Sequence, residues 1–170
     1  MNGQDKGWCL HQGEPFIKLV LKQLQQQCLG DKTTIIISAN RNLSAYQQLG
    51  VEVVSDQREN YCGPLSGIES VMEKFQNHKV DRWIVYPVDS INVPINYLKQ
   101  MLELNENQTG YILQDQQPHF AHLSIASIHQ ASLSDYLNSE QRSIKGWLRQ
   151  INAIPIMNLG DETIANINKI

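Results

Sequence analysis

Four polar side chains could carry phosphate or metal chemistry because of where they stand in the sequence. Lys6 lies in a glycine-rich start, where backbone can approach an anion closely and an ammonium can neutralise phosphate charge. Asp89 follows a buried-type apolar run and a proline, so its carboxylate should project from a strand end and could hold Mg²⁺. Asn40 and Asp56 stand in equivalent places after two earlier strand-like runs.

Each of these residues also has a plainer explanation. Lys6 could belong to a solvated chain terminus. Asp89 could cap a helix that begins near Pro94. Asn40 and Asp56 are residue types that favour turns through local hydrogen bonds. Position alone therefore leaves both interpretations open.

Several common site chemistries lack their motifs in this sequence. Neither the P-loop pattern nor the G-x-G-x-x-G dinucleotide pattern occurs, so a phosphate site would need another device. His119 and His122 are an odd number of residues apart on a predicted strand, which predicts rings on opposite faces and disfavours zinc. No nucleophile elbow or suitably spaced glutamate pair supports a covalent hydrolase.

Composition narrows the class of protein further. The 170 residues carry a formal net charge of −3 from 14 basic and 17 acidic groups, without a run of either sign. The sequence therefore has no cluster of basic residues that would bind duplex nucleic acid or an anionic membrane. Three cysteines without metal-ligand spacing favour a reducing compartment, and no apolar stretch is long enough for a membrane span. We expect a cytoplasmic protein without nucleic-acid or membrane partners.

Hydrophobic periodicity predicts alternating helices and strands. Apolar residues recurring every three or four positions predict helices over 17–28, 44–49, 64–75, 94–102, 132–137 and 144–151. Short apolar or β-branched runs predict strands over 33–38, 51–55, 82–86, 110–114, 119–127 and 153–157.

This alternation predicts a three-layer α/β/α sandwich with a mostly parallel sheet. The closeness of 110–114 to 119–127 predicts an antiparallel pair or an edge strand. Ligands of such sheets bind at the carboxyl ends of the strands. Asn40, Asp56 and Asp89 should therefore converge at one edge.

Six short motifs together resemble a known family. They are Met-Asn-Gly-Gln-Asp-Lys-Gly at 1–7, Ser-Ala-Asn-Arg at 38–41, Val-Ser-Asp at 54–56, Gly-Pro-Leu-Ser-Gly at 63–67, Pro-Val-Asp-Ser at 87–90 and Asn-Ile-Asn at 166–168. Their order and spacing resemble the molybdenum cofactor guanylyltransferases over nearly the whole chain. The resemblance implies a Rossmann-like nucleotidyltransferase fold as a single domain over 1–170. It also implies transfer of GMP from Mg·GTP to molybdopterin, which forms molybdopterin guanine dinucleotide and pyrophosphate.

The resemblance also implies roles for the four polar residues. Lys6 and Asp89 would be catalytic, and Asp89 would bind Mg²⁺. Lys6 and Asp89, together with Asn40 and Asp56, would contact GTP.

Further residues follow from the same resemblance. The loop containing Gly63, Pro64 and Gly67 would shape the pocket. Asn166 and Asn168 would lie on the molybdopterin side. Molybdoenzymes or their chaperones would be partners that receive the product.

One departure from the family keeps other functions open. Family members begin with a strand, expected to be central to the sheet, and a glycine-rich loop that helps to bind the base; this sequence starts at the methionine of that loop. A related enzyme that uses CTP, or another small-molecule nucleotidyltransferase, is therefore an alternative. A shortened, non-catalytic protein that binds a nucleotide or molybdopterin is another.

Overall fold

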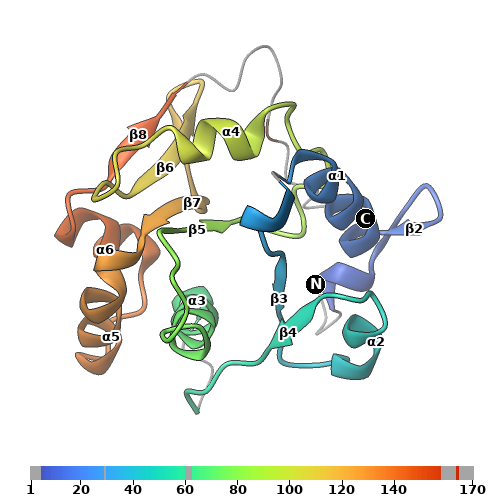
Figure 1. Ribbon diagram of the computed structural model, residues 1–170, viewed down its shortest axis with the longest axis horizontal. Coiled ribbons are helices and arrows are strands. Elements are labelled where there is room, and N and C mark those ends of the chain that lie inside the picture. The colour runs from blue at the N-terminus through green and yellow to red at the C-terminus, as the bar shows by residue number, and fades with distance from the viewer. Residues whose placement is uncertain (1–4, 29, 60–62, 158–163, 165–170) are drawn as a thin grey trace.

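The computed structural model describes residues 5–28, 30–59, 63–157 and 164 (Figure 1). Its α-helices are α1 (Phe16–Gln27), α2 (Leu43–Gln47), α3 (Pro64–Lys74), α4 (Tyr97–Leu102), α5 (Gln130–Asn138) and α6 (Ile144–Gln150). Its strands are β1 (Leu10–His11), β2 (Glu14–Pro15), β3 (Ile36–Ser38), β4 (Glu52–Val54), β5 (Arg82–Val85), β6 (Gly110–Gln114), β7 (Gln117–Ala126) and β8 (Ile154–Ile156). Three short 3-10 helices are η1 (Lys6–Trp8), η2 (Gly30–Lys32) and η3 (Ser127–His129). Each predicted helix and strand overlaps an observed one.

Two local differences from the predicted elements have clear backbone causes. The helix expected to open at Pro94 begins only at Tyr97, because Asn96 has a left-handed φ of 64°.

The hairpin of β1 and β2 has no counterpart among the predicted strands. Its two loop residues, Gln12 and Gly13, both have positive φ, and Gln-Gly lacks the Asn or Asp that usually marks such a turn.

The sheet strands run mostly in one direction. β3 and β4 pair in parallel, and a second ladder has the order β5-β7-β6-β8. β7 is antiparallel to both β5 and β6, whereas β6 and β8 are parallel, so β7 alone is reversed in this ladder. The predicted antiparallel pair is thus confirmed as β6 and β7.

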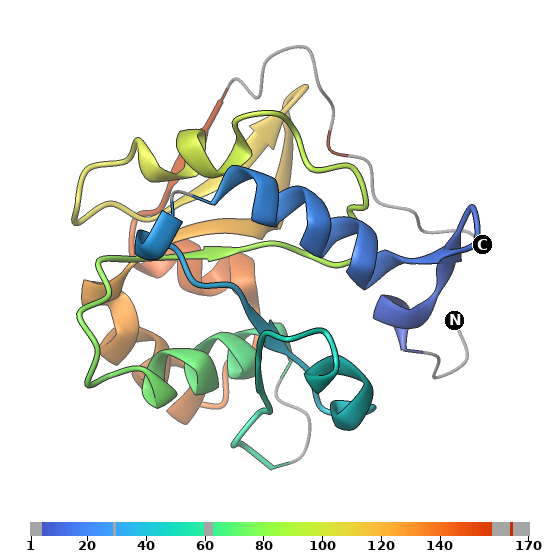
Figure 2. The same cartoon turned by 45° about the vertical axis from the view of Figure 1, so that its right-hand side comes forward.

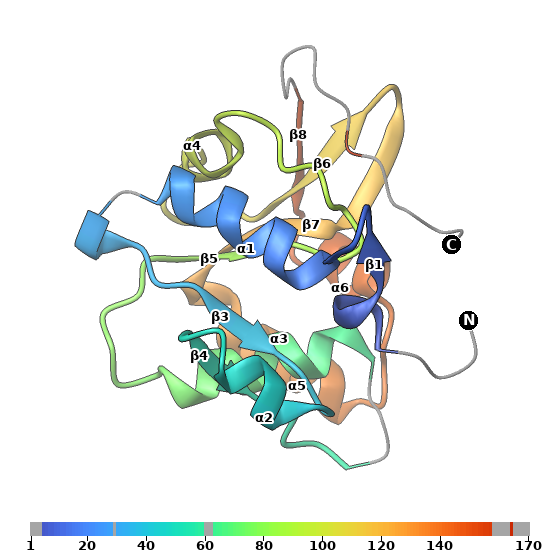
Figure 3. The ribbon, with the colours of Figure 1, turned by 90° about the vertical axis from the view of Figure 1, so that its right-hand side faces the viewer.

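Helices cover both faces of the larger ladder. α1 and α4 lie on one face, and α3, α5 and α6 lie on the other, as Figures 2 and 3 show. The first face buries Val20, Tyr97 and Met101 against β6 and β8, and the second buries Leu65 and other helix residues against β7. The predicted three-layer sandwich is confirmed. In the part of the chain that the structure describes, no helix is long and apolar enough to cross a membrane.

A bulge in β7 changes the orientation of one histidine. Tyr111 pairs with Leu123, but the next residue of β6, Ile112, pairs with His119. One step along β6 therefore corresponds to four steps along β7, and the alternation of side chains is broken. The rings of His119 and His122 lie 6.1 Å apart between centroids. The expectation that they face opposite sides was wrong because it assumed a regular strand.

A partly buried ion pair ties the loop after β4 to two helices. The Arg58 guanidinium donates to both carboxylate oxygens of Glu69 on α3, at 2.5 and 2.7 Å, and to the Asn138 side chain on α5 at 2.9 Å. Burial disfavours the charged form of Glu69 and by itself would raise its pKa. The hydrogen bonds from Arg58 and Ser134 outweigh this effect, so the pKa of Glu69 lies below its usual value.

This lowered pKa predicts a pH-dependent loss of stability. Because the folded state holds Glu69 charged, the pair stabilises the fold above the unfolded glutamate pKa of about 4.3 and loses that contribution as pH falls further. Glu69→Gln should lower the free energy of unfolding by about 2–3 kcal/mol at pH 7. Urea denaturation should show this difference shrinking only as pH falls through the lowered pKa of folded Glu69, because the wild-type carboxyl then becomes protonated as well. If wild type and Glu69→Gln differ in unfolding free energy by the same amount at pH 7 and at acid pH, the prediction is contradicted.

Candidate functional site

Lys6 and Asp89, which are 83 positions apart in sequence, form a direct ion pair. The Lys6 Nζ lies 2.7 Å from an Asp89 carboxylate oxygen. Asp89 stands in the turn after β5, and its side chain is 14% exposed, whereas Lys6 in η1 is 47% exposed. The helix cap near this turn is Asn96 rather than Asp89. The structure therefore brings the two predicted catalytic residues together at a strand end.

Asp5 fixes the segment that carries Lys6. Its carboxylate accepts from the Gly7 backbone N–H at 3.1 Å and from the Tyr46 hydroxyl at 2.7 Å. Its second oxygen accepts from the Asn42 amide at 3.0 Å. Burial, together with the nearby Asp5 carboxylate, raises the pKa of Tyr46, so the hydroxyl stays protonated and donates. Lys6 thus belongs to a docked segment and not to a solvated tail.

Close packing also restricts this N-terminal segment. A Cβ at Gly7 would collide with the Tyr46 hydroxyl, and the Trp8 and Tyr46 rings pack with centroids 5.2 Å apart. Asp5 stands next to Lys6, but the sequence around it gives no sign of this role. Its partners lie on and before α2, far away in sequence, so no local pattern could reveal them.

Asn40 and Asp56 meet at the carboxyl ends of β3 and β4. The Asp56 backbone N–H donates to the Asn40 side-chain oxygen at 2.8 Å. The Ser55 hydroxyl donates to the Ala39 carbonyl at 2.9 Å, so the two loops are held side by side. Because the parallel strands end together, the predicted convergence of these two residues is confirmed.

The start of α3 lies directly against this pair of loops. Gly63 precedes the helix with φ 79°, and Pro64 occupies the first turn. A Cβ on Gly67 would lie 2.5 Å from the Ser38 hydroxyl and 3.1 Å from an Asp56 carboxylate oxygen. Glycine at this position therefore lets the helix approach the strand ends closely.

The predicted site residues thus form two groups, joined by Asp5. Lys6 and Asp89 make the first group, and Asn40, Asp56 and Gly67 make the second. Asp5 bridges them, because it caps the segment of Lys6 and accepts from Asn42 two residues after Asn40. Figure 2 shows the N-terminal segment and α2 on the same side of the molecule. Asn166 and Asn168 lie outside the described residues.

The pair of Lys6 and Asp89 could accept a divalent metal that arrives bound to the phosphates of a ligand. The Lys6 ammonium shows that a cation is favoured next to the Asp89 carboxylate. Among the described residues, no group of three or more His, Cys, Asp and Glu side chains could hold a metal ion. A single carboxylate such as Asp89 could hold a divalent metal that takes its other ligands from phosphate oxygens and water.

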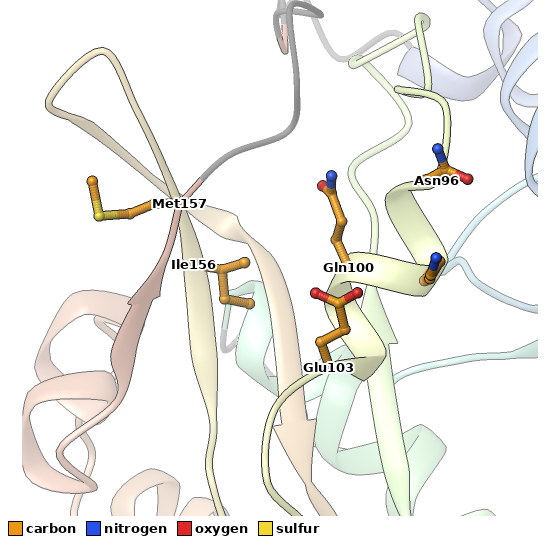
Figure 4. Close-up of a pocket in the computed structure, with 6 residues that line it drawn as sticks. Asn96, Gln100, Glu103, Ile156 and Met157 are labelled. Atoms are coloured by element: carbon orange, nitrogen blue, oxygen red, sulfur yellow. The ribbon is translucent and has the colours of Figure 1, made fainter.

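A hollow elsewhere contains none of the predicted site residues. It has a volume of about 260 Å³ and lies between α4 and the end of β8 (Figure 4). Its lining residues are Asn96, Lys99, Gln100, Glu103, Ile156 and Met157. This hollow is separate from the candidate site at the strand ends, where the charged pair and the close-packed glycine lie.

The chain is an α/β protein with a mostly parallel sheet, and solved proteins share this fold. Molybdopterin-guanine dinucleotide biosynthesis protein A from Archaeoglobus fulgidus is similar with a TM-score of 0.71 and 16% identity, over 91% of this chain and 76% of that protein. 4-Diphosphocytidyl-2C-methyl-D-erythritol synthase is similar with a TM-score of 0.65 and 11% identity, over 98% of this chain and 88% of that protein. At such identities the likeness shows the fold alone, and it confirms the predicted Rossmann-like class.

Sequence similarity shows the family. The MobA-like NTP transferase domain matches residues 1–154. Molybdenum cofactor guanylyltransferase of Histophilus somni (strain 2336) is 32% identical over 174 residues, which cover 100% of this chain and 86% of that protein. The protein of the same name from Mannheimia succiniciproducens is 28% identical over 174 residues, with 100% and 88% covered. The chain belongs to the MobA-like NTP transferase domain family and is a nucleotidyltransferase, which confirms the resemblance seen in the motifs.

Proposed function

We propose that this chain transfers GMP from Mg·GTP to the terminal phosphate of molybdopterin, the activity for which its relatives are named. The observation that carries the proposal is the contact between Lys6 and Asp89 at the end of β5. A lysine and a single carboxylate suit a reaction in which phosphate charge must be neutralised and no protein nucleophile is needed. The products are molybdopterin guanine dinucleotide and pyrophosphate.

Lys6 and Asp89 have complementary roles toward the charge of the phosphates. A bound Mg²⁺ would neutralise charge on the triphosphate. Asp89 would supply the carboxylate that holds this ion, and the Lys6 ammonium beside it would neutralise charge on the phosphates. A phosphate oxygen of molybdopterin attacks the α-phosphorus, and the bond to the β-phosphate breaks. The two side chains therefore position charge and form no covalent intermediate.

Asn40 and Asp56 hold the nucleotide beside them. The Asn40 oxygen is engaged by the Asp56 backbone, so Asn40 would approach GTP through its amide N–H groups. The Asp56 carboxylate would accept from GTP N–H or O–H groups. Gly63, Pro64 and Gly67 keep α3 close to these atoms. On the acceptor side, the roles of Asn166 and Asn168 and transfer of the product to molybdoenzymes or their chaperones stay predictions.

A nucleotide-choice assay tests the proposal. We expect pyrophosphate release with GTP and molybdopterin that depends on Mg²⁺, and weaker release when CTP replaces GTP. Preferred use of CTP would instead support a different nucleotidyltransferase. Tight nucleotide binding without turnover would support a non-catalytic binding protein. Omitting molybdopterin is the matched control, because simple GTP hydrolysis would persist without the acceptor.

A further inference from the structure

A buried polar cluster lies behind the turn that carries Asp89. It consists of Tyr86, Ser90, Tyr97 and His122, which come from the end of β5, the turn after it, α4 and β7. Ser90 and Tyr97 are fully buried, and His122 is 1% exposed. Ser90 is the residue next to Asp89, so the cluster reaches the proposed metal ligand through one peptide bond.

His122 enters this cluster from the end of the β7 bulge, directly before the regularly paired Leu123. The neighbouring β6 residues Tyr111 and Ile112 pair with Leu123 and His119 of β7. His122 lies between these two partners, in the part of β7 that has no regular partner on β6. In this position the imidazole has a partner at each nitrogen. Nε2 lies 3.0 Å from the Ser90 hydroxyl, and Nδ1 lies 3.2 Å from the Tyr97 hydroxyl.

One proton arrangement satisfies these contacts together. The Tyr97 hydroxyl also lies within 3.4 Å of the Val85 carbonyl, to which it can donate. Nδ1–H of His122 then donates to the Tyr97 oxygen, and Nε2 accepts from the Ser90 hydroxyl. This arrangement needs a neutral imidazole. Burial, and the charge of His119, lower the pKa of His122 to about 3, although the Asp89 carboxylate opposes the shift.

The backbone of the same turn is held from the other side. The Tyr86 hydroxyl donates to the Ser90 carbonyl at 2.7 Å and to the Asn92 carbonyl at 3.1 Å. Its ring meets the rings of Tyr97 and His122 edge to face, with centroids 5.0 and 4.9 Å apart. Ser90 is therefore fixed through its carbonyl by Tyr86 and through its hydroxyl by His122.

We propose that His122 is a positioning residue for Asp89, acting through its hydrogen bond to the Ser90 hydroxyl. The inference rests on the proposed role of Asp89 as a metal ligand. His122 does not touch the ligand. It fixes the turn so that the Asp89 carboxylate is already oriented toward the site before the metal and the phosphates bind, which reduces the ordering cost of binding.

Two amide replacements separate positioning from packing. The side-chain amide of Gln can reach the place of Nε2, so His122→Gln can keep the contact with Ser90. The shorter amide of His122→Asn reaches the place of Nδ1 and can keep only the contact with Tyr97. We expect the Asn variant to bind Mn²⁺ in the presence of GTP about 3- to 10-fold more weakly than wild type, the effect of losing one neutral hydrogen bond. The Gln variant should stay closer to wild type.

The readouts are Mn²⁺ affinity by electron paramagnetic resonance and thermal unfolding without ligand. Similar thermal stabilities with different Mn²⁺ affinities would support positioning. Equal affinities of the two variants, or affinities that follow thermal stability, would overturn it. Ser90→Ala removes the same contact from the other side and should match the Asn variant. It decides the question if the histidine variants do not fold.

An Asp89→Asn background separates this inference from the proposed function. If His122 acts through Asp89, adding His122→Asn to Asp89→Asn should cause no further loss of Mn²⁺ affinity. A further loss of the same size would show that His122 acts by another route. If Asp89→Asn alone leaves Mn²⁺ affinity and turnover unchanged, the proposed role of Asp89 itself fails.

Discussion

Replacing Asp89 with asparagine should lower kcat/KM for GTP by at least about 100-fold, while the protein keeps its fold. Asparagine has nearly the same shape, and its side-chain oxygen can still accept from Lys6. The Ser90 and Tyr86 contacts that hold the turn do not involve the Asp89 side chain. The variant therefore loses the carboxylate charge that should hold the metal, and little else. Pyrophosphate release at saturating Mg²⁺ would measure this loss.

A matched control uses another lysine–carboxylate pair, which also joins two segments that are distant in sequence. Glu52 on β4 pairs with Lys74 at the end of α3, and both side chains are well exposed. Glu52→Gln makes the same chemical change away from the Asp89 turn, and exposed pairs contribute little. We expect its kcat/KM to match that of wild type. An Asp89→Asn enzyme within a few-fold of wild type would remove Asp89 from the mechanism.

The helices and strands could be predicted because their signals are local. The periodic spacing of apolar residues located α1, α3 and α6, and apolar or β-branched runs located the strands of both ladders. The rule that ligands bind at strand ends then placed Asn40 and Asp56 together, as the structure shows. Local pattern and sheet geometry were sufficient for this part of the site.

Contacts between distant segments could not be predicted in the same way. Asp5 depends on Tyr46 and Asn42, and nothing around Asp5 in the sequence indicates these partners. The rings of His119 and His122 lie close together and not on opposite faces, because strand alternation fails where β7 bulges. In both cases tertiary packing decides what a side chain meets.

Replacing Lys6 with methionine should also lower turnover by about 100-fold, because the phosphates lose a positive charge that stabilises the transition state. Its effect on metal binding should have the opposite sign to that of Asp89→Asn. Without nucleotide, the Lys6 ammonium occupies the Asp89 carboxylate at 2.7 Å, so a divalent ion must displace it. Methionine removes that competitor and keeps a flexible side chain of similar length.

Nucleotide-free Mn²⁺ titration should therefore show tighter binding to Lys6→Met than to wild type. The gain should be only about 3-fold, since Lys6 is half-exposed and water screens the pair. Lys6→Arg is the matched control, because it keeps the charge and should keep the competition. If Lys6→Met leaves Mn²⁺ affinity unchanged, the ammonium does not compete with the metal for Asp89. If Lys6→Met binds Mn²⁺ more tightly and still loses turnover, the Lys6 ammonium occupies the metal position on Asp89 before the metal binds. It then acts on the phosphates once the nucleotide is bound.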